Sequence, residues 1–227
     1  MHIMIDLESY GGRDDAQILQ ISAVAFELNG TVLEPHELLQ YDDRWFDAVI
    51  EPYYASRDAS NEAFWKSEEA APAAARIAER PQVPIDTALQ GFTAFAGRWL
   101  GQRGRVWAKP PQFDLRILRA AYSESAWSGT REAPWHRAQE ADLSTLLWIA
   151  RKVPRINFKA PDMAGAGLVK HYALHDAVHQ AVIAQAAFRS LLYSAAQRGS
   201  DRDAMLAAQQ QEIEDAIPST KGSPSQG

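Results

Sequence analysis

The chain contains no cysteine, which excludes a disulfide framework and thiolate metal sites. It also lacks any run near the roughly 18 apolar residues that a membrane-spanning helix requires. At its N-terminus there is no basic stretch followed by an apolar stretch and small residues, which would mark a secretion signal. These absences predict a protein of the reducing cytoplasm without a membrane segment.

An excess of basic residues is absent as well. The chain has 23 Lys and Arg against 29 Asp and Glu, so its net charge is −6. Proteins that coat nucleic acid are usually basic, so a polyanion would have to be met locally, by bound metal or a small basic patch. With 227 residues, 46% of them hydrophobic, the chain has enough material for one sizeable α/β domain or two small ones.

The order of patterns along the chain predicts a mixed sheet with helices against it. Residues 18–28 form an apolar strand pattern, Asn29-Gly30 predicts a tight hairpin turn, and residues 31–40 are expected to return as the next strand. A further strand is expected at 106–108. Ser60 is the predicted N-cap of a short helix, and other helices are expected at 72–80, 86–100, 112–122, 142–152 and 174–197. Residues 1–198 are interpreted as the domain, and 199–227 as a polar helix with a disordered tail.

The most informative segment is Met4-Ile5-Asp6-Leu7-Glu8, a short apolar strand with two acids. Side chains two residues apart on a strand share a face, so Asp6 and Glu8 stand close together. Two ionised carboxylates repel each other unless a cation lies between them. The segment therefore indicates either a site for a hard divalent cation such as Mg²⁺ or a solvated strand end with two exposed acids.

Three further polar positions are candidates for chemistry. Asp114 begins a helix directly after a strand, where an acid also simply complements the helix dipole. Asp176 lies in an otherwise apolar helix, where a buried carboxylate has to be paired or bind metal. His171 precedes this helix, and histidine is the side chain most easily poised as a general base near neutral pH.

The same helix permits a rival interpretation. His175 and His179 lie four residues apart with Asp176 between them, which mimics the His-Glu-x-x-His zinc site of metalloproteases. The acid is one methylene shorter than in that motif, and no histidine follows His179 as a third ligand. The alternative for both histidines is a polar helix face.

Taken in order, Asp6-x-Glu8, Phe113-Asp114-x-x-Ile117-Leu118 and the segment 171–181 resemble the motifs of the DEDDh family of 3′–5′ exonucleases. The last segment, His-Tyr-Ala-Leu-His-Asp-Ala-Val-His-Gln-Ala, resembles the family's third motif. Within the family, the chain is most similar to small enzymes related to a T4 phage exonuclease and a mycobacterial exoribonuclease. The shared features are Phe64-Trp65, Val106-Trp107 before Phe113-Asp114, and Pro134-Trp135. The likeness runs from about residue 3 to residue 192.

This resemblance implies a ribonuclease H-like α/β fold, with a mixed sheet that opens as an antiparallel meander and helices on both faces. It implies hydrolysis of phosphodiesters at single-stranded or overhanging 3′ ends of RNA or DNA, with two Mg²⁺ or Mn²⁺ ions. The implied metal ligands are Asp6, Glu8, Asp114 and Asp176, the implied general base is His171, and the implied substrate contacts are Leu7, Phe64, Trp65 and Phe113. His171 and Asp176 are five positions apart, about 500° of helix, so both cannot face the site from one regular helix; His171 is therefore expected on a mobile loop before the helix, following Gly165-Ala166-Gly167.

The sequence departs from the family pattern at two arginines. Relatives carry Arg-Asp-hydrophobic-Arg-Thr where this chain has Ala141-Asp142-Leu143-Ser144-Thr145, so the arginines are missing at Ala141 and Ser144. Lys109, Arg137 or Lys170 are candidate replacements. The pattern does not choose between RNA and DNA, and it leaves open a catalytically silent relative and a homodimer.

Overall fold

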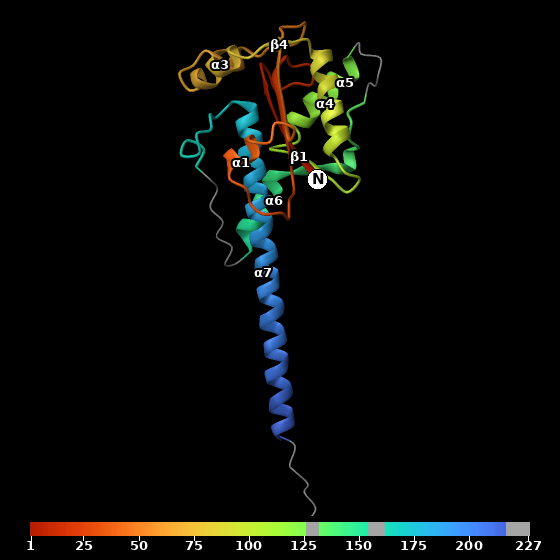
Figure 1. Cartoon of the computed structure of the whole chain (residues 1–227), viewed down its shortest axis with the longest axis vertical. Coiled ribbons are helices and arrows are strands. Elements are labelled where there is room, and N and C mark those ends of the chain that lie inside the picture. The colour runs from red at the N-terminus through yellow and green to blue at the C-terminus, as the bar shows by residue number, and fades with distance from the viewer. Residues whose placement is uncertain (126–131, 154–161, 217–227) are drawn as a thin grey trace, which may run out of the picture.

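The computed structural model describes residues 1–125, 132–153 and 162–216. Within these residues six strands form one mixed sheet in the order β4-β3-β2-β1-β5-β6 (Figure 1). β1 (His2–Ser9), β2 (Ile18–Phe26) and β3 (Trp45–Ile50) are antiparallel neighbours, whereas β5 (Val106–Ala108) runs parallel to β1. The edge strands are β4 (Gln82–Val83), parallel to β3, and β6 (Glu140–Asp142), parallel to β5.

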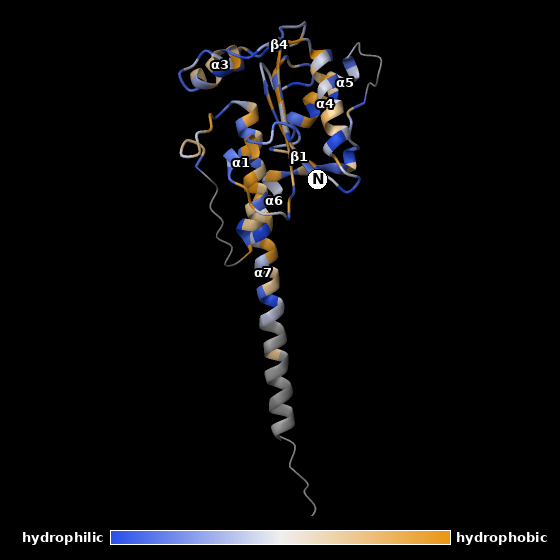
Figure 2. Cartoon of the chain, in the orientation of Figure 1, coloured by the Kyte–Doolittle hydropathy of each residue, from blue (hydrophilic) through white to orange (hydrophobic). Residues whose placement is uncertain are grey.

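Helices cover both faces of the sheet, because the central strands are apolar on both sides. Along β1, Met4 packs into one core with α7 (Ala173–Ala216) and α6 (Leu143–Lys152). Ile3 and Ile5 point the opposite way, into a second core with α4 (Ile85–Trp99) and α5 (Asp114–Glu124). Three shorter helices are α1 (Pro35–Leu39), α2 (Ala59–Trp65) and α3 (Ala71–Ala78). Figure 2 shows hydrophobic residues gathered where α7 lies beside the sheet.

These features confirm the predicted α/β class, with an antiparallel start to a mixed sheet and helices on both faces. The predicted helix start at Asp142 is also confirmed, since its carboxylate accepts the Ser144 N–H at 2.8 Å. No helix among the described residues is both long and apolar enough to cross a bilayer.

The predicted strand at 31–40 is wrong. A turn does form at Asn29-Gly30, but no hairpin partner follows it. Pro35 instead begins the short helix α1, where its missing N–H costs nothing, and the Glu37 carboxylate accepts the Glu34 N–H at 2.6 Å. The third strand of the meander is β3, which begins at Trp45.

Two predicted helix boundaries are also wrong. The N-cap position of α2 is Asp58 rather than Ser60. The last helix does not end near Gln197 but continues as one helix to Ala216, and its C-terminal part projects away from the other elements (Figure 1). The expected loop at 153–167 lies partly outside the described residues, and the expected disordered tail, 217–227, lies wholly outside them.

Candidate active site

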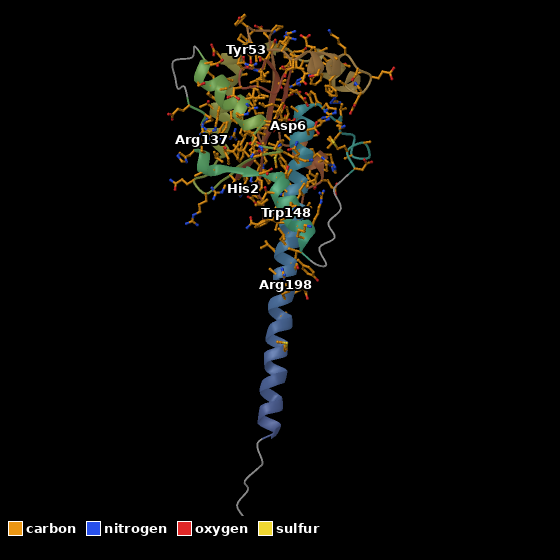
Figure 3. The ribbon with its side chains drawn as sticks, turned by 180° about the vertical axis from the view of Figure 1, so that it is seen from behind. His2, Asp6, Tyr53, Arg137, Trp148 and Arg198 are labelled. Carbon is orange, nitrogen blue, oxygen red and sulfur yellow. The ribbon has the colours of Figure 1, made fainter. Side chains whose placement is uncertain are left out.

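Two of the predicted metal ligands lie on the face of β1 that α7 covers. Strand alternation places Asp6 and Glu8 on the same side as Met4, whereas the Leu7 side chain, 3% exposed, points into the opposite core. In Figure 3, Asp6 lies beside the N-terminal part of α7. Arg198 lies far from Asp6, at the point where α7 leaves the body of the molecule. The acids are therefore partly buried between the sheet and this helix.

Asp114 reaches the same place from α5. Because β5 runs parallel to β1 and ends at Ala108, the following turn brings the first residue of α5 to the C-terminal end of β1. The Oδ1 atom of Asp114 accepts the backbone N–H of Leu7 at 3.0 Å, and the residue is only 3% exposed. Such burial is not what a simple surface acid at a helix start would show.

The first turns of α7 contribute Asp176 and Gln180, which are four residues apart and so share a helix face. Gln180 Nε2 donates a hydrogen bond to Asp6 Oδ1 at 2.7 Å. Its Oε1 atom is buried and has no hydrogen-bond partner among the described residues. Gln180 belongs to the third sequence motif, but no role was predicted for it from the sequence. Its spacing of four residues from Asp176 could have predicted that its side chain also faces the acids.

His171 lies in the turn directly before α7, as expected. Its φ is 64°, a left-handed conformation that is unfavourable for a residue other than glycine. The Asp176 Oδ2 atom accepts the His171 N–H at 2.6 Å and so stabilises this conformation. Strained backbone of this kind is often concentrated at functional sites.

The imidazole of His171 contacts two groups from the region of α2 and α3. The Phe64 ring meets it edge-on, with centroids 4.9 Å apart. Glu69 Oε1 lies 3.5 Å from His171 Nε2 and 3.0 Å from Lys170 Nζ. No pattern in the sequence indicated Glu69, which belongs to an exposed turn.

Burial raises the pKa values of all four carboxylates, and neighbouring carboxylate charges add to the effect at Asp6, Glu8 and Asp114. Burial, then the charges of Asp114, Glu8 and Asp176, raise the pKa of Asp6 well above its ordinary value. Burial and the Asp176 charge do the same for the pKa of Glu8. Burial raises the pKa of Asp114 to about 7, against the opposing effect of the Leu7 N–H. Burial also raises the pKa of Asp176. The four acids are thus close enough to act as a unit.

This donor set fits a hard divalent cation. Fixed carboxylate oxygens are the ligands that Mg²⁺ and Mn²⁺ prefer, and a bound cation would stabilise the ionised form of all four acids. Ligand atoms of Glu8, His171 and Asp176 all lie within 4.8 Å of one another. Charge interactions join Asp6 and Asp114 to Glu8 and Asp176, so the structure brings together all five predicted catalytic residues.

The raised pKa values predict how stability changes with pH. An unfolded aspartate has a pKa of about 4, whereas that of Asp114 in the metal-free fold is about 7. Between these values the folded protein holds more protons than the unfolded chain, so the free energy of unfolding falls as pH rises. We expect thermal unfolding in EDTA to shift downward from pH 5 to pH 8. Added Mg²⁺ should stabilise the protein most at pH 8, and a Mg²⁺ effect equal at both pH values would contradict the assignment.

The zinc-protease interpretation does not fit the geometry. His175 is 5% exposed, and its Nδ1 accepts the Val169 N–H at 2.8 Å. Burial lowers the pKa of His175 to about 4, which suits a neutral structural side chain. Within the described ranges, the cluster of candidate ligands contains neither His175 nor His179.

The four predicted substrate contacts are placed differently from one another. Trp65 is 9% exposed and donates its indole N–H to the Ser9 carbonyl at 3.1 Å, so it belongs to the core. Phe113 is partly buried against the second core. Leu7 is held by its backbone bond to Asp114, with its side chain in the core. Phe64 is partly buried and is the aromatic ring beside His171.

A buried polar network that sequence patterns did not reveal anchors the start of α7. The side chain of Asp47 on β3 is 0% exposed. Its carboxylate accepts hydrogen bonds from Gln20 Nε2 at 2.7 Å and Tyr172 OH at 2.9 Å, and Arg80 lies 3.2 Å away. Gln20 Oε1 in turn accepts the N–H of Ala173, the first residue of α7, at 3.1 Å.

This network holds the backbone next to His171, because Tyr172 is its immediate neighbour. Burial and the Asp47 charge raise the pKa of Tyr172 to about 12, so the phenol stays protonated and donates. The sequence held one indication of this network: Asp47 lies inside the apolar strand pattern Trp45–Ile50, and a buried acid needs hydrogen-bonding partners.

Asp47→Ala should therefore destabilise the protein by about 2–3 kcal/mol, because several buried donors lose their acceptor. It should also lower turnover, because the turn that carries His171 loses its anchor. The matched control is Asp43→Ala, which breaks an exposed pair with Arg98 and should cost less than about 1 kcal/mol. Urea unfolding and steady-state kinetics measure both effects, and equal costs for the two variants would show that the network has no anchoring role.

Comparison with known proteins gives the following similarities. The crystal structure of cell-death related nuclease 4 (CRN-4) has 14% sequence identity to this chain and a TM-score of 0.49, covering 81% of this chain and 62% of that one. The RNase domain of the yeast Pop2 protein has 14% identity and a TM-score of 0.47, covering 84% and 76% respectively. The chain thus spans less than two thirds of the CRN-4 structure. No significant sequence match was found among curated proteins.

A family model provides the assignment. It matches residues 1–188, a range that includes all four carboxylates, His171 and Gln180. The matched range ends inside α7, before the part of this helix that projects from the domain. The chain belongs to the family of Rv2179c-like 3′–5′ exoribonuclease domains, and so to a family of phosphodiester hydrolases.

Proposed function

We propose that this chain removes nucleotides one at a time from single-stranded 3′ ends of RNA by metal-dependent hydrolysis. The observation that carries the proposal is the meeting of Asp6, Glu8, Asp114 and Asp176 with His171, from three separate elements. RNA is the proposed substrate because the family is one of exoribonuclease domains. DNA remains the alternative, to be decided by assay.

Asp6, Glu8, Asp114 and Asp176 would hold the divalent ions. When bound, two such ions would activate water for attack and stabilise the negative charge on the leaving 3′ oxygen. The rigid attachment of the acids to β1, α5 and α7 fixes where the ions would be held, and so where the scissile phosphate would bind. Gln180 keeps Asp6 in its rotamer through the 2.7 Å hydrogen bond.

His171 takes the proton from the attacking water, as general-base catalysis requires. Its strained turn places the ring beside Glu8 and Asp176, and Phe64 restricts the ring from the other side. The exposed part of Phe64 offers a stacking surface for the terminal base, which contributes about 1–3 kcal/mol per base in single-strand binding. Stacking of this kind favours an unpaired 3′ end, because a paired one must first be unstacked.

Digestion of matched single-stranded RNA and DNA, each labelled at the 5′ end, tests the proposal. With Mg²⁺ or Mn²⁺, and not with EDTA, we expect a ladder of RNA products that shortens from the 3′ end. An RNA whose 3′ end is sealed in a duplex should be degraded more slowly. Internal cleavage, or degradation that persists in EDTA, would contradict the proposed reaction.

A further inference from the structure

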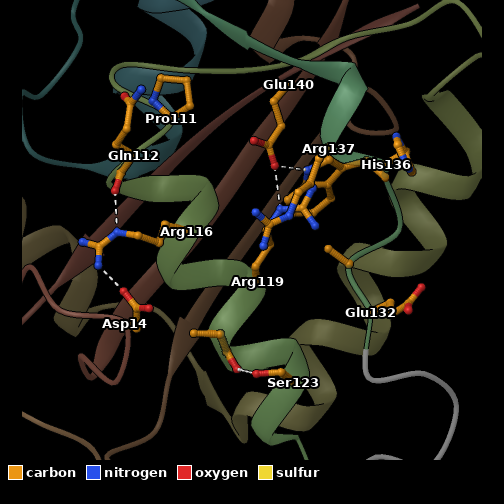
Figure 4. A pocket seen from close by; sticks show the side chains of 13 residues that line it. Asp14, Pro111, Gln112, Arg116, Arg119, Ser123, Glu132, His136, Arg137 and Glu140 are labelled. Carbon is orange, nitrogen blue, oxygen red and sulfur yellow. Dashed lines mark hydrogen bonds and ion pairs between the residues drawn. The ribbon is translucent and has the colours of Figure 1, made fainter.

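A groove of about 740 Å³ runs along the outer face of α5 (Figure 4). Arg116, Arg119 and Ser123 line it from α5 at spacings of three and four residues, which place them on one helical stripe, and Gln112 lines it from the turn before α5. The opposite wall is formed by Glu132, Ala133, Trp135, His136, Arg137 and Glu140. One end of the groove, at Gln112, lies at the N-terminal end of α5, the end from which Asp114 enters the active site.

The three arginines of the groove differ in how their donors are used. All three guanidinium nitrogens of Arg116 donate hydrogen bonds, to the Gln112 carbonyl at 2.7 Å, the Gly12 carbonyl and the Asp14 carboxylate. Arg119 donates its Nε–H to Glu140 Oε1 at 2.6 Å and lies over the Trp135 ring at 5.1 Å. Its Nη2 atom is buried without a hydrogen-bond partner in the described part of the chain.

A buried donor without an acceptor is unfavourable, so Arg119 Nη2 is suited to a ligand that brings an oxygen acceptor into the groove. Arg137, on the opposite wall, has no ion pair or side-chain hydrogen bond within residues 1–125, 132–153 and 162–216. Two arginines whose guanidinium groups have spare donors thus line one groove. Guanidinium groups match phosphate oxygens well in geometry and charge.

The acidic side chains of the groove weaken the positive electrostatic potential that its arginines create. Asp14, Glu132 and Glu140 balance the three arginines in formal charge, and Asp14 and Glu140 are each held by one of them. A ligand would therefore be bound by directed hydrogen bonds and only weakly by long-range attraction. Weak binding of this kind fits an enzyme that releases its substrate after each cut.

We infer that this groove binds the sugar–phosphate backbone of the RNA upstream of the nucleotide that is removed, with Arg119 Nη2 and Arg137 as phosphate ligands. The inference rests on the proposed function. Arg119 lies five residues beyond Asp114, about 7.5 Å along the helix axis and about 140° around it. A stacked strand rises about 3.4 Å per nucleotide, so these contacts lie at least about two nucleotides upstream of the scissile phosphate.

The test compares Arg137→Ala with Arg103→Ala, an exposed arginine that does not line the groove. We expect Arg137→Ala to lower kcat/KM about tenfold on an RNA of about 12 nucleotides and to change it less than about twofold on a dinucleotide. The salt dependence of the reaction on the longer RNA should weaken by about one unit of slope. Arg119→Lys, which keeps the charge but loses the planar fork, should show a smaller effect in the same direction.

Equal losses on both substrates, or no loss on either, would overturn the inference. To separate it from the proposed function, binding of labelled RNA is also measured by fluorescence anisotropy in the inactive Asp114→Asn background. If the wild-type protein hydrolyses RNA but Arg137→Ala weakens neither turnover nor binding of the longer RNA, the groove inference fails alone. If no hydrolysis occurs but Arg137→Ala still weakens binding of only the longer RNA, the proposed function fails and the groove stands.

Discussion

Asp114→Asn should abolish RNA hydrolysis while leaving the fold intact. The asparagine keeps an oxygen that can accept the Leu7 N–H, which Asp114 Oδ1 accepts at 3.0 Å, so the start of α5 retains its anchor. What is lost is the charge that completes the metal site. Since bound ions supply several kcal/mol of charge stabilisation, we expect kcat to fall by about 10³-fold or more.

The same variant has a second expected effect that distinguishes loss of metal from loss of folding. In EDTA at pH 8 it should unfold at a higher temperature than the wild type, because one of four mutually repelling buried carboxylates has become neutral. Stabilisation by added Mg²⁺ should shrink in parallel. Asp43→Asn, at an exposed pair with Arg98, is the control and should change neither property. Full activity of Asp114→Asn would remove the metal assignment.

His171→Ala should lower kcat by about 10²–10⁴-fold, the usual contribution of a general base. Stabilisation by Mg²⁺ or Mn²⁺ should change much less, because Asp6, Glu8, Asp114 and Asp176 still provide the carboxylates. His171 lies near Glu8 and Asp176, so a role as a metal ligand has to be tested directly. Metal titrations followed by thermal unfolding, beside single-turnover kinetics, make the comparison.

The matched control is His36→Ala, since His36 is exposed on α1. It should leave both properties within error of the wild type. Comparable losses of turnover and of metal binding in His171→Ala would make His171 a ligand or a structural residue. A variant that loses neither would show that the proton is taken by another group.

The positions of the candidate site residues on their strands and helices could be predicted from local sequence. Asp6 and Glu8 share a strand face by alternation alone, and Asp114 and His171 are placed by elements that begin beside them. The start of α6 at Asp142 was likewise visible, because a capping side chain acts on its own helix. In each case the interaction is between residues close in sequence, or follows from a regular period.

Other features depend on contacts between distant segments, which no local pattern encodes. Phe64 and Trp65 are adjacent, yet only packing against β1 and the α7 turn makes the second a core residue and the first a neighbour of His171. Residues 31–40 were expected to form a strand, but Pro35 begins the helix α1 within them, and β3 pairs with β2 in their place.

From its residues alone, the chain resembles a family of 3′–5′ exonucleases, because the motif residues and their spacing are local properties of the sequence. The anchor at Asp47 and the groove beside α5 depend on the fold. Asp47 meets Tyr172 across 125 positions of sequence, and Arg119 meets Glu140 from a separate strand. Such long-range contacts form only when the sheet order brings their elements together. They determine how the turn that carries His171 is anchored and where the RNA is proposed to lie.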